Sequence, residues 1–146
     1  MENVVIYSRV STKDQNCENQ IELLTKIINQ NGWNLIDTYV DEGISGSKGR
    51  ESRKEFDRLN KDMIRRKFTK IMVWDISRLG RSLQHLVEFL NDVISINCNL
   101  YIHQSGLDTS TPSGKIQLFF KTFVLTLVSK NHYILLKLVR SAQRKI

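Results

Sequence analysis

The segment NVVIYSRVSTKDQ, residues 3–15, joins a run of apolar and β-branched residues to a polar stretch. Its apolar first half predicts a buried strand, because β-branched residues at this length favour strands. Thr12 and Gln15 have the spacing of a capping box, which predicts that a helix follows. Ser11 therefore falls between strand and helix, two residues after Arg9. From position alone, a helix cap or turn residue is the simpler interpretation of Ser11 than a nucleophile or a phosphate ligand.

Strand-like and helix-like segments alternate along the rest of the chain. Further strands are expected at 33–41, 70–76 and 98–105. Helices, with apolar residues at intervals of three and four, are expected at 12–28, 52–64, 83–94 and from 112 onward. This order predicts an α/β fold with a doubly wound, mainly parallel sheet in three layers, arranged as in flavodoxin and followed by a long C-terminal helix.

Local signals mark where two of the helices begin. Ser52 and Glu55 form a second capping box, and Thr111–Pro112 pairs an N-cap residue with proline in the first helical position. No proline or glycine interrupts the last helix after its first turn, so it is expected to be about 50 Å long at 1.5 Å per residue. The chain is accordingly divided into a domain at 1–110 and a long helix at 111–146.

Charge is segregated along the sequence. The chain has 22 lysines and arginines against 15 acidic residues, and its whole net charge of +7 lies in residues 109–146, which contain no acidic residue. A segregated basic tail favours a polyanion as partner, nucleic acid first and an anionic membrane surface second. A solvated basic helix without a partner is the alternative.

Several classes of protein are disfavoured. No segment has the roughly 20 apolar residues that span a membrane, and the N-terminus does not have the pattern of a secretory signal. Cys17 and Cys98 are far apart and are expected to be free thiols in a reducing cytoplasm. The histidines are scattered, and neither a metal-ligand spacing nor a phosphate-binding glycine loop is present.

In a doubly wound sheet the reactive groups gather at the carboxyl ends of the strands. The polar residues that follow the predicted strands are Arg9, Ser11, Asp41, Ser77, Arg78 and Arg81. Arginine pairs with phosphate oxygens through its fork of donors and stays charged at any working pH. A serine among arginines predicts attack on a phosphodiester, with a sugar hydroxyl as leaving group and no need for a nucleotide cofactor. Taken singly, these residues have simpler interpretations: Asp41 could close a turn, and Arg78 and Arg81 could lie on a solvated helix face.

Four motifs in order, YSRVSTKDQ, DEGISGSKGRESRKEF, VWDISRLGRS and GLDTSTPSGK, resemble the serine site-specific recombinases, which include resolvases, DNA invertases, integrases and transposases. The resemblance covers residues 4–118. It implies a resolvase-like catalytic domain whose long helix packs subunits into dimers and synaptic tetramers. It also implies double-stranded DNA as substrate and chemistry without metal or nucleotide.

The resemblance assigns roles residue by residue. Ser11 matches the nucleophile that joins to a DNA 5′ phosphate. Arg9, Arg78 and Arg81 match the arginines that bind the scissile phosphate, and Arg53 matches the arginine of the mobile loop. The supporting positions are Tyr7, Gln15, Gln20, Asp41, Ser45 and Ser77, the last of which stands where many members have aspartate.

The long helix departs from the family pattern. Its middle, FVLTLVSKNHYILLKL, has no acidic residue where members usually carry acidic-basic pairs, and relatives continue beyond Ile146 into a DNA-binding region. Its first half is apolar nearly all round, which predicts burial against a partner subunit, with a membrane surface as the minor alternative. Its second half offers candidates for contact with the DNA backbone: Lys137, Arg140, Arg144 and Lys145.

Three functions follow from these patterns. The first is the catalytic domain of a cytoplasmic DNA recombinase of a prokaryotic or phage mobile element. The second is a truncated or degenerate relative that only dimerises or binds DNA. The third, a flavodoxin-like nucleotide-binding module, is disfavoured because the chain has no phosphate loop.

Overall fold

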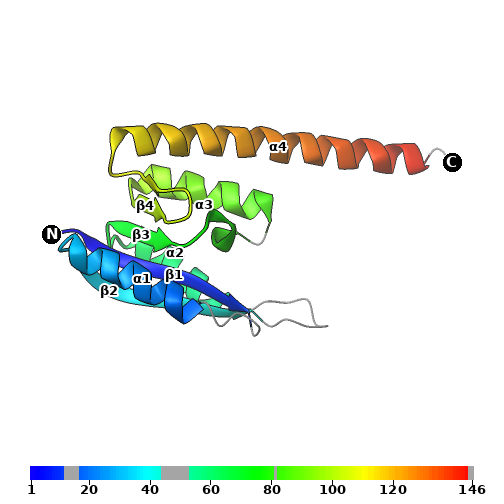
Figure 1. The fold of residues 1–146 in the computed structure, drawn as a ribbon. Helices are drawn as coiled ribbons and strands as arrows, with labels where there is room; N and C mark the ends of the chain where they lie inside the picture. The colour runs from blue at the N-terminus through cyan, green and yellow to red at the C-terminus, as the bar shows by residue number, and fades with distance from the viewer. Residues whose placement is uncertain (12–16, 44–52, 81, 145–146) are drawn as a thin grey trace.

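The computed structural model describes residues 1–11, 17–43, 53–80 and 82–144. Figure 1 shows the arrangement of their helices and strands. In chain order the elements are β1 (Asn3–Ser11), α1 (Cys17–Gln30), β2 (Asn34–Gly43), α2 (Lys54–Ile64), β3 (Lys70–Val73), a 3₁₀ helix (Ile76–Leu79), α3 (Leu83–Ile96), β4 (Asn99–Ile102), β5 (Leu107–Asp108) and α4 (Pro112–Arg144).

The sheet has the strand order β2-β1-β3-β4-β5, in which the first four strands are parallel and β5 is antiparallel to β4. The predicted doubly wound, mainly parallel α/β fold with a long C-terminal helix is confirmed. Three strand ends differ from the prediction, and the first is that of β2, which continues to Gly43, two residues past its predicted end at 41. β3 ends at Val73 and β4 at Ile102, each three residues short of its predicted end, because the chain turns there into the 3₁₀ helix and toward β5.

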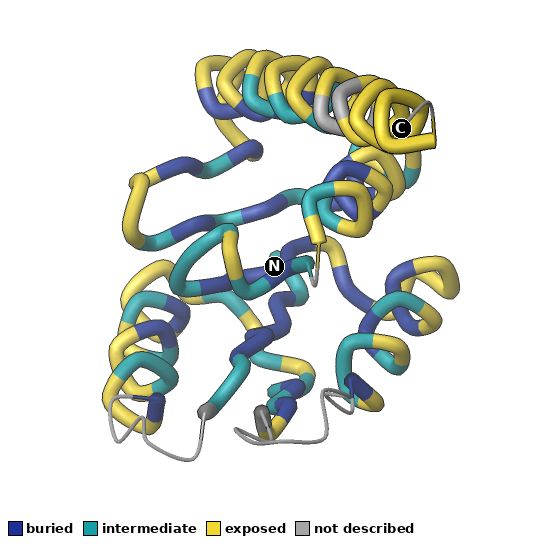
Figure 2. Tube along the Cα trace, turned by 90° about the vertical axis from the view of Figure 1, so that its right-hand side faces the viewer, coloured by how far each residue is buried: buried dark blue, intermediate teal, exposed yellow. Residues whose placement is uncertain are grey.

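Helices cover both faces of the sheet, as the view toward the carboxyl ends of the strands shows (Figure 2). Alternate residues of β1 point to opposite faces. Val4 and Ile6 pack with Leu24 and Ile28 of α1 on one face. On the other face, Val5 and Tyr7 belong to the larger core, which also contains Leu59 and Met63 of α2 and Leu90 and Val93 of α3. Tyr7 is therefore directed to the α2–α3 side of the sheet.

The start of α2 differs from the prediction. The N-cap residue is Arg53, which makes no side-chain cap hydrogen bond, and Ser52 lies outside the described residues. Instead, the Asp41 carboxylate at the end of β2 accepts hydrogen bonds from the backbone N–H groups of Glu55, at 2.9 Å, and Phe56, at 3.0 Å. A carboxylate from another strand thus satisfies free N–H groups of the first turn, and the Ser52 half of the predicted capping box lies outside the described residues.

The start of α4 follows the prediction. Thr111 Oγ1 accepts a hydrogen bond from the N–H of Gly114 at 3.1 Å, and Pro112 is the first helical residue. A side chain at position 114 has no space, since a Cβ atom there would lie 1.8 Å from the carbonyl oxygen of Asp108. The first turn of α4 is therefore pressed directly against the end of β5.

Most of α4 is exposed within one chain (Figures 1 and 2). Leu118 and Thr122 are buried toward the domain, and α4 packs on α3 and β5. The large apolar side chains left exposed along the first half of α4 are those of Ile116, Phe119, Phe120, Phe123, Val124, Leu127 and Val128. The burial predicted for this half is not provided by the domain itself. No helix in the described part of the chain has the length and hydropathy to cross a membrane.

A buried lysine lies at the opposite end of the sheet from Asp41. Lys70, the first residue of β3, is 0% exposed. Its ammonium group lies 3.2 Å from a carboxylate oxygen of Asp108 and 3.5 Å from one of Glu2. It also lies 3.9 Å from the centre of the Trp33 ring. This cluster joins β1, β3 and the residues that lead into α4.

Candidate active site

The carboxyl edge of the sheet collects most of the polar residues that the sequence placed there. In the pairing of β1 with β2, Arg9 lies opposite Asp41 and Ser11 opposite Gly43. Arg78 follows β3 in the 3₁₀ helix, and its Nη1 donates to the carbonyl oxygen of Arg9 at 3.3 Å. The backbone of Ser11 is thus placed at the end of the strand that also carries Arg9. The side chain of Ser11 lies outside the described part.

Tyr7 connects the groups at this edge. Its hydroxyl donates to Asp41 Oδ2 at 2.8 Å and accepts from Arg53 Nη2 at 3.1 Å. The same Nη2 group donates to the carbonyl oxygen of Arg78 at 2.9 Å. Residues from β1, β2, the start of α2 and the 3₁₀ helix are therefore held in one hydrogen-bonded cluster. Tyr7, Asp41 and Arg53 are 1%, 4% and 5% exposed.

The protonation of this cluster follows from its surroundings. Burial raises the pKa of the Tyr7 phenol far above its usual value. The hydrogen bond from Arg53 opposes this rise in pKa, whereas the hydrogen bond to Asp41 adds to it. Tyr7 is therefore a neutral hydroxyl at physiological pH, able to donate to a carboxylate and accept from a guanidinium at once.

Asp41 does more than close a turn after β2, because it holds two other parts of the site in place. It accepts hydrogen bonds from Tyr7 and from the two backbone N–H groups at the start of α2. A carboxylate at a helix N-terminus is stabilised by those N–H groups and by the positive end of the helix dipole. Asp41 therefore fixes both the phenol of Tyr7 and the first turn of α2, and with it Arg53.

Two supporting positions lie apart from the Tyr7–Arg53 cluster. Gln20 is in the first turns of α1, which packs on the other face of the sheet. Ser77 is exposed, and its hydroxyl donates to Asp75 Oδ2 at 2.7 Å. Arg81, Gln15 and Ser45 lie outside the described residues, as does Lys145. Lys137, Arg140 and Arg144 are exposed on the last turns of α4.

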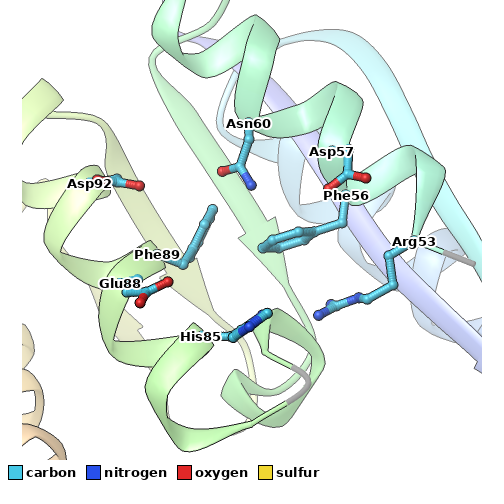
Figure 3. Close-up of a pocket in the computed structure, with 8 residues that line it drawn as sticks. All are labelled: Arg53, Phe56, Asp57, Asn60, His85, Glu88, Phe89 and Asp92. Atoms are coloured by element: carbon cyan, nitrogen blue, oxygen red, sulfur yellow. The ribbon is translucent and has the colours of Figure 1, made fainter. Parts of the chain in front are cut away.

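The sequence patterns missed the aromatic surroundings of Arg53. The Arg53 Cζ atom lies 4.3 Å from the centre of the Phe56 ring, and Phe56 packs against Phe89 of α3 at 5.0 Å between ring centres. These side chains line a pocket of about 230 Å³ between α2 and α3 (Figure 3). Helical spacing marks Phe56 only as a core residue, so no signal in the sequence distinguishes it.

No group of three or more His, Cys, Asp or Glu side chains within the described ranges is arranged to hold a metal ion. The cluster offers hydrogen-bond donors and positive charge at a strand end instead. Such groups bind an anion and stabilise negative charge that develops on it.

The comparisons with known proteins agree with this fold. Residues 4–132 match the sequence model of the family described as "Resolvase, N terminal domain". The chain belongs to that family. It is 31% identical over 117 residues to the transposon Tn917 resolvase of Enterococcus faecalis, covering 79% of this chain and 55% of the relative. It is 34% identical over 110 residues to a DNA-invertase of Escherichia phage P1, covering 75% and 53%. The chain thus spans about half the length of these curated relatives.

Solved structures are similar over nearly the whole chain. The N-terminal catalytic domain of TP901-1 integrase has a TM-score of 0.72 at 30% identity, covering 92% of this chain and 98% of that one. A resolvase family site-specific recombinase from Streptococcus pneumoniae has a TM-score of 0.78 at 23% identity, covering 99% and 98%, and supports the fold alone. Both similarities include the region of α4.

Proposed function

We propose that this chain is the catalytic domain of a DNA recombinase in which Ser11 is the nucleophile. The observation that carries the proposal is the buried cluster of Tyr7, Asp41, Arg53 and the Arg78 backbone at the strand end that bears Ser11. Membership of the resolvase N-terminal domain family supports DNA as the substrate.

The reaction needs no co-reactant. The Ser11 hydroxyl oxygen attacks the scissile phosphorus, the new oxygen–phosphorus bond forms a 5′-phosphoserine ester, and the bond to the 3′ oxygen breaks. The serine proton is transferred to the departing 3′ oxygen, which leaves as the 3′ hydroxyl. After strand exchange the reverse reaction joins a 3′ hydroxyl to the phosphate and frees Ser11, so the ester conserves the bond energy without metal or nucleotide.

The arginines would stabilise charge on the phosphate. Arg9, Arg78 and Arg81 are proposed to contact its non-bridging oxygens, with Arg53 as a further cation beside them. Tyr7 and Asp41 are proposed to hold Arg53 and the start of α2 in place. The assignments of Gln15, Gln20, Ser45 and Ser77 as supporting residues rest on the family resemblance alone.

The long helix would serve assembly and DNA contact. A second copy of the chain would cover the exposed apolar side chains of α4, which exceed what a solvated helix normally presents. Its basic last turns, with Lys137, Arg140, Arg144 and Lys145, would lie along the DNA backbone. The proposed assemblies are a dimer and, with two DNA sites, a tetramer.

The test is the formation of a covalent protein–DNA adduct. The purified chain is incubated with a pool of duplexes that carry a randomised central segment, and the reaction is stopped with detergent. Adducts that survive denaturing electrophoresis are recovered, digested with protease and sequenced. We expect adducts from the wild type and from Ser105→Ala, a control at an exposed turn, and none from Ser11→Ala. Equal adduct yields from wild type and Ser11→Ala contradict the proposal.

A second candidate is a relative that binds DNA or dimerises without cutting. It is favoured by one observation, the absence of any acidic residue from α4. In this case the wild type and Ser11→Ala bind the same duplexes in a gel-shift assay and neither forms an adduct.

A further inference from the structure

Among the described residues, the buried Arg53 guanidinium has no ion-pair partner. Its side chain is 5% exposed, and within the described ranges no carboxylate lies at ion-pair distance from it. Its hydrogen bonds go to neutral oxygens, the Tyr7 hydroxyl and the Arg78 carbonyl. The nearby Asp41 carboxylate is occupied by Tyr7 and the first turn of α2. No carboxylate of the described ranges therefore pairs directly with Arg53.

Aromatic rings take the place of that counter-charge. The guanidinium carbon lies 4.3 Å from the centre of the Phe56 ring and 5.9 Å from that of Tyr7. Phe56 is held from behind by Phe89 at 5.0 Å and from the edge by Tyr7 at 5.3 Å. Figure 3 shows Arg53 and Phe56 on the α2 side of the pocket, with Phe89 on the α3 side.

An aromatic ring face and a carboxylate differ in how much of the charge and how many N–H donors of an arginine they leave available to a ligand. The negative face of an aromatic ring attracts a cation, and this attraction is strongest where water is excluded. It neither neutralises the charge nor occupies the N–H donors. Asp57, Glu88 and Asp92 line the same pocket, but none of them is ion-paired with Arg53. An anion that approaches Arg53 would therefore not have to displace a carboxylate from it.

We propose that Phe56, supported by Phe89, is a positioning residue that holds the Arg53 guanidinium charged and oriented for the DNA phosphate. This inference rests on the proposed recombinase function. Phe56 acts through Arg53 and does not itself touch the phosphate. Loss of the ring then lowers the rate of the cleavage step and leaves the binding of DNA unchanged.

The test measures the rate of adduct formation at saturating DNA, using a duplex recovered from the randomised pool. Phe56→Leu removes the ring and keeps an apolar side chain of similar size, and we expect about a tenfold slower rate, the order of effect of losing a cation–π contact to a desolvated charge. Phe56→Tyr restores the ring face and should restore the rate to within about twofold of wild type. Phe68→Leu is the matched control, because Phe68 is a buried ring that packs on Tyr39 away from Arg53.

A double-mutant cycle separates positioning from a general loss of packing. If Phe56 acts through Arg53, then Phe56→Leu has no further effect on the rate in an Arg53→Gln background. DNA affinity from gel shifts should stay within about twofold of wild type for Phe56→Leu, Phe56→Tyr and Phe68→Leu, none of which removes a charge. Melting temperatures confirm that each variant is folded at the assay temperature.

Three outcomes overturn the inference. A wild-type rate for Phe56→Leu shows that the ring is not needed. An equal loss in Phe68→Leu, or an undiminished effect of Phe56→Leu in the Arg53→Gln background, shows that packing alone is responsible. A different result would show that the proposed function itself is wrong: the wild type would form no Ser11-dependent adduct. In that case this inference fails together with the proposed function.

Discussion

Replacement of Lys70 by methionine tests the buried cluster at the base of the sheet. The substitution keeps most of the apolar stem, removes the charge that Asp108 and Glu2 surround, and removes the cation beside the Trp33 ring. Breaking a fully buried ion pair from one side costs about 3–5 kcal/mol. Here the two carboxylates are 24% and 22% exposed and remain partly hydrated, so we expect a loss of about 2–3 kcal/mol. For a domain of this size that is a decrease in melting temperature of roughly 10 °C.

Thermal unfolding followed by circular dichroism measures this loss, and Lys67→Met is the matched control. Lys67 pairs with Asp62 at 3.1 Å, but its side chain is 52% exposed, so its loss should cost less than about 1 kcal/mol. Equal melting temperatures for wild type and Lys70→Met, or equal losses in the two variants, would refute the reasoning.

The same cluster predicts a pH dependence. Burial alone would raise the pKa of Asp108, but hydrogen bonds from Ser110 and Lys70 outweigh it and hold the pKa below the usual aspartate value. A carboxyl group whose pKa is lowered by folding stabilises the fold above its unfolded pKa, and this contribution disappears as the pH falls through the folded pKa. The stability difference between wild type and Lys70→Met should therefore be full near pH 7 and shrink below about pH 4. A difference that stays constant between these pH values would contradict this assignment.

Two further substitutions probe the site edge and the start of α4. Tyr7→Phe removes the hydroxyl between Asp41 and Arg53. We expect the free energy of unfolding to fall by about 1–3 kcal/mol and the rate of adduct formation to decrease. Wild-type values for both would show that this hydrogen-bonded bridge is dispensable. Gly114→Ala places a Cβ atom against the carbonyl oxygen of Asp108, so we expect a loss of more than about 2 kcal/mol, seen as a lower midpoint in urea unfolding; an unchanged midpoint would show that the start of α4 adjusts freely.

The parts of the fold that depend on local pattern could be predicted from the sequence. The apolar residues of β1 and the Thr111–Pro112 start of α4 are short-range signals, and both were confirmed. β5 could not be found, because a two-residue strand has no periodicity. The capping of α2 by Asp41 could not be predicted, because Asp41 is 14 residues before Glu55 and reaches it only after the sheet has formed.

For the candidate site, the sequence predicted which edge of the sheet carries the polar residues, but it did not predict the contacts between their side chains. The rule that reactive groups gather at the carboxyl ends of parallel strands placed Asp41 and Arg78 at one edge, and the structure places them there. The rule could not show that Tyr7 joins Asp41 to Arg53, because such a bond depends on which face of the sheet each side chain takes. Nor could helical spacing distinguish Phe56, which contacts Arg53, from any other core residue.

The close contact at the start of α4 also determines where the far end of that helix projects. α4 has 33 residues, which at 1.5 Å per residue gives a lever of about 50 Å. Turning a helix of this length by about 10° at its first turn would move its last turn by roughly 9 Å, between two and three base-pair steps of about 3.4 Å each. Two contacts with Asp108 hold the first turn of α4. Gly114 packs against the Asp108 carbonyl oxygen, and Lys70 pairs with the Asp108 carboxylate. The direction in which the basic last turns of α4, with Arg140 and Arg144, project from the domain is accordingly determined by residues at the other end of the helix.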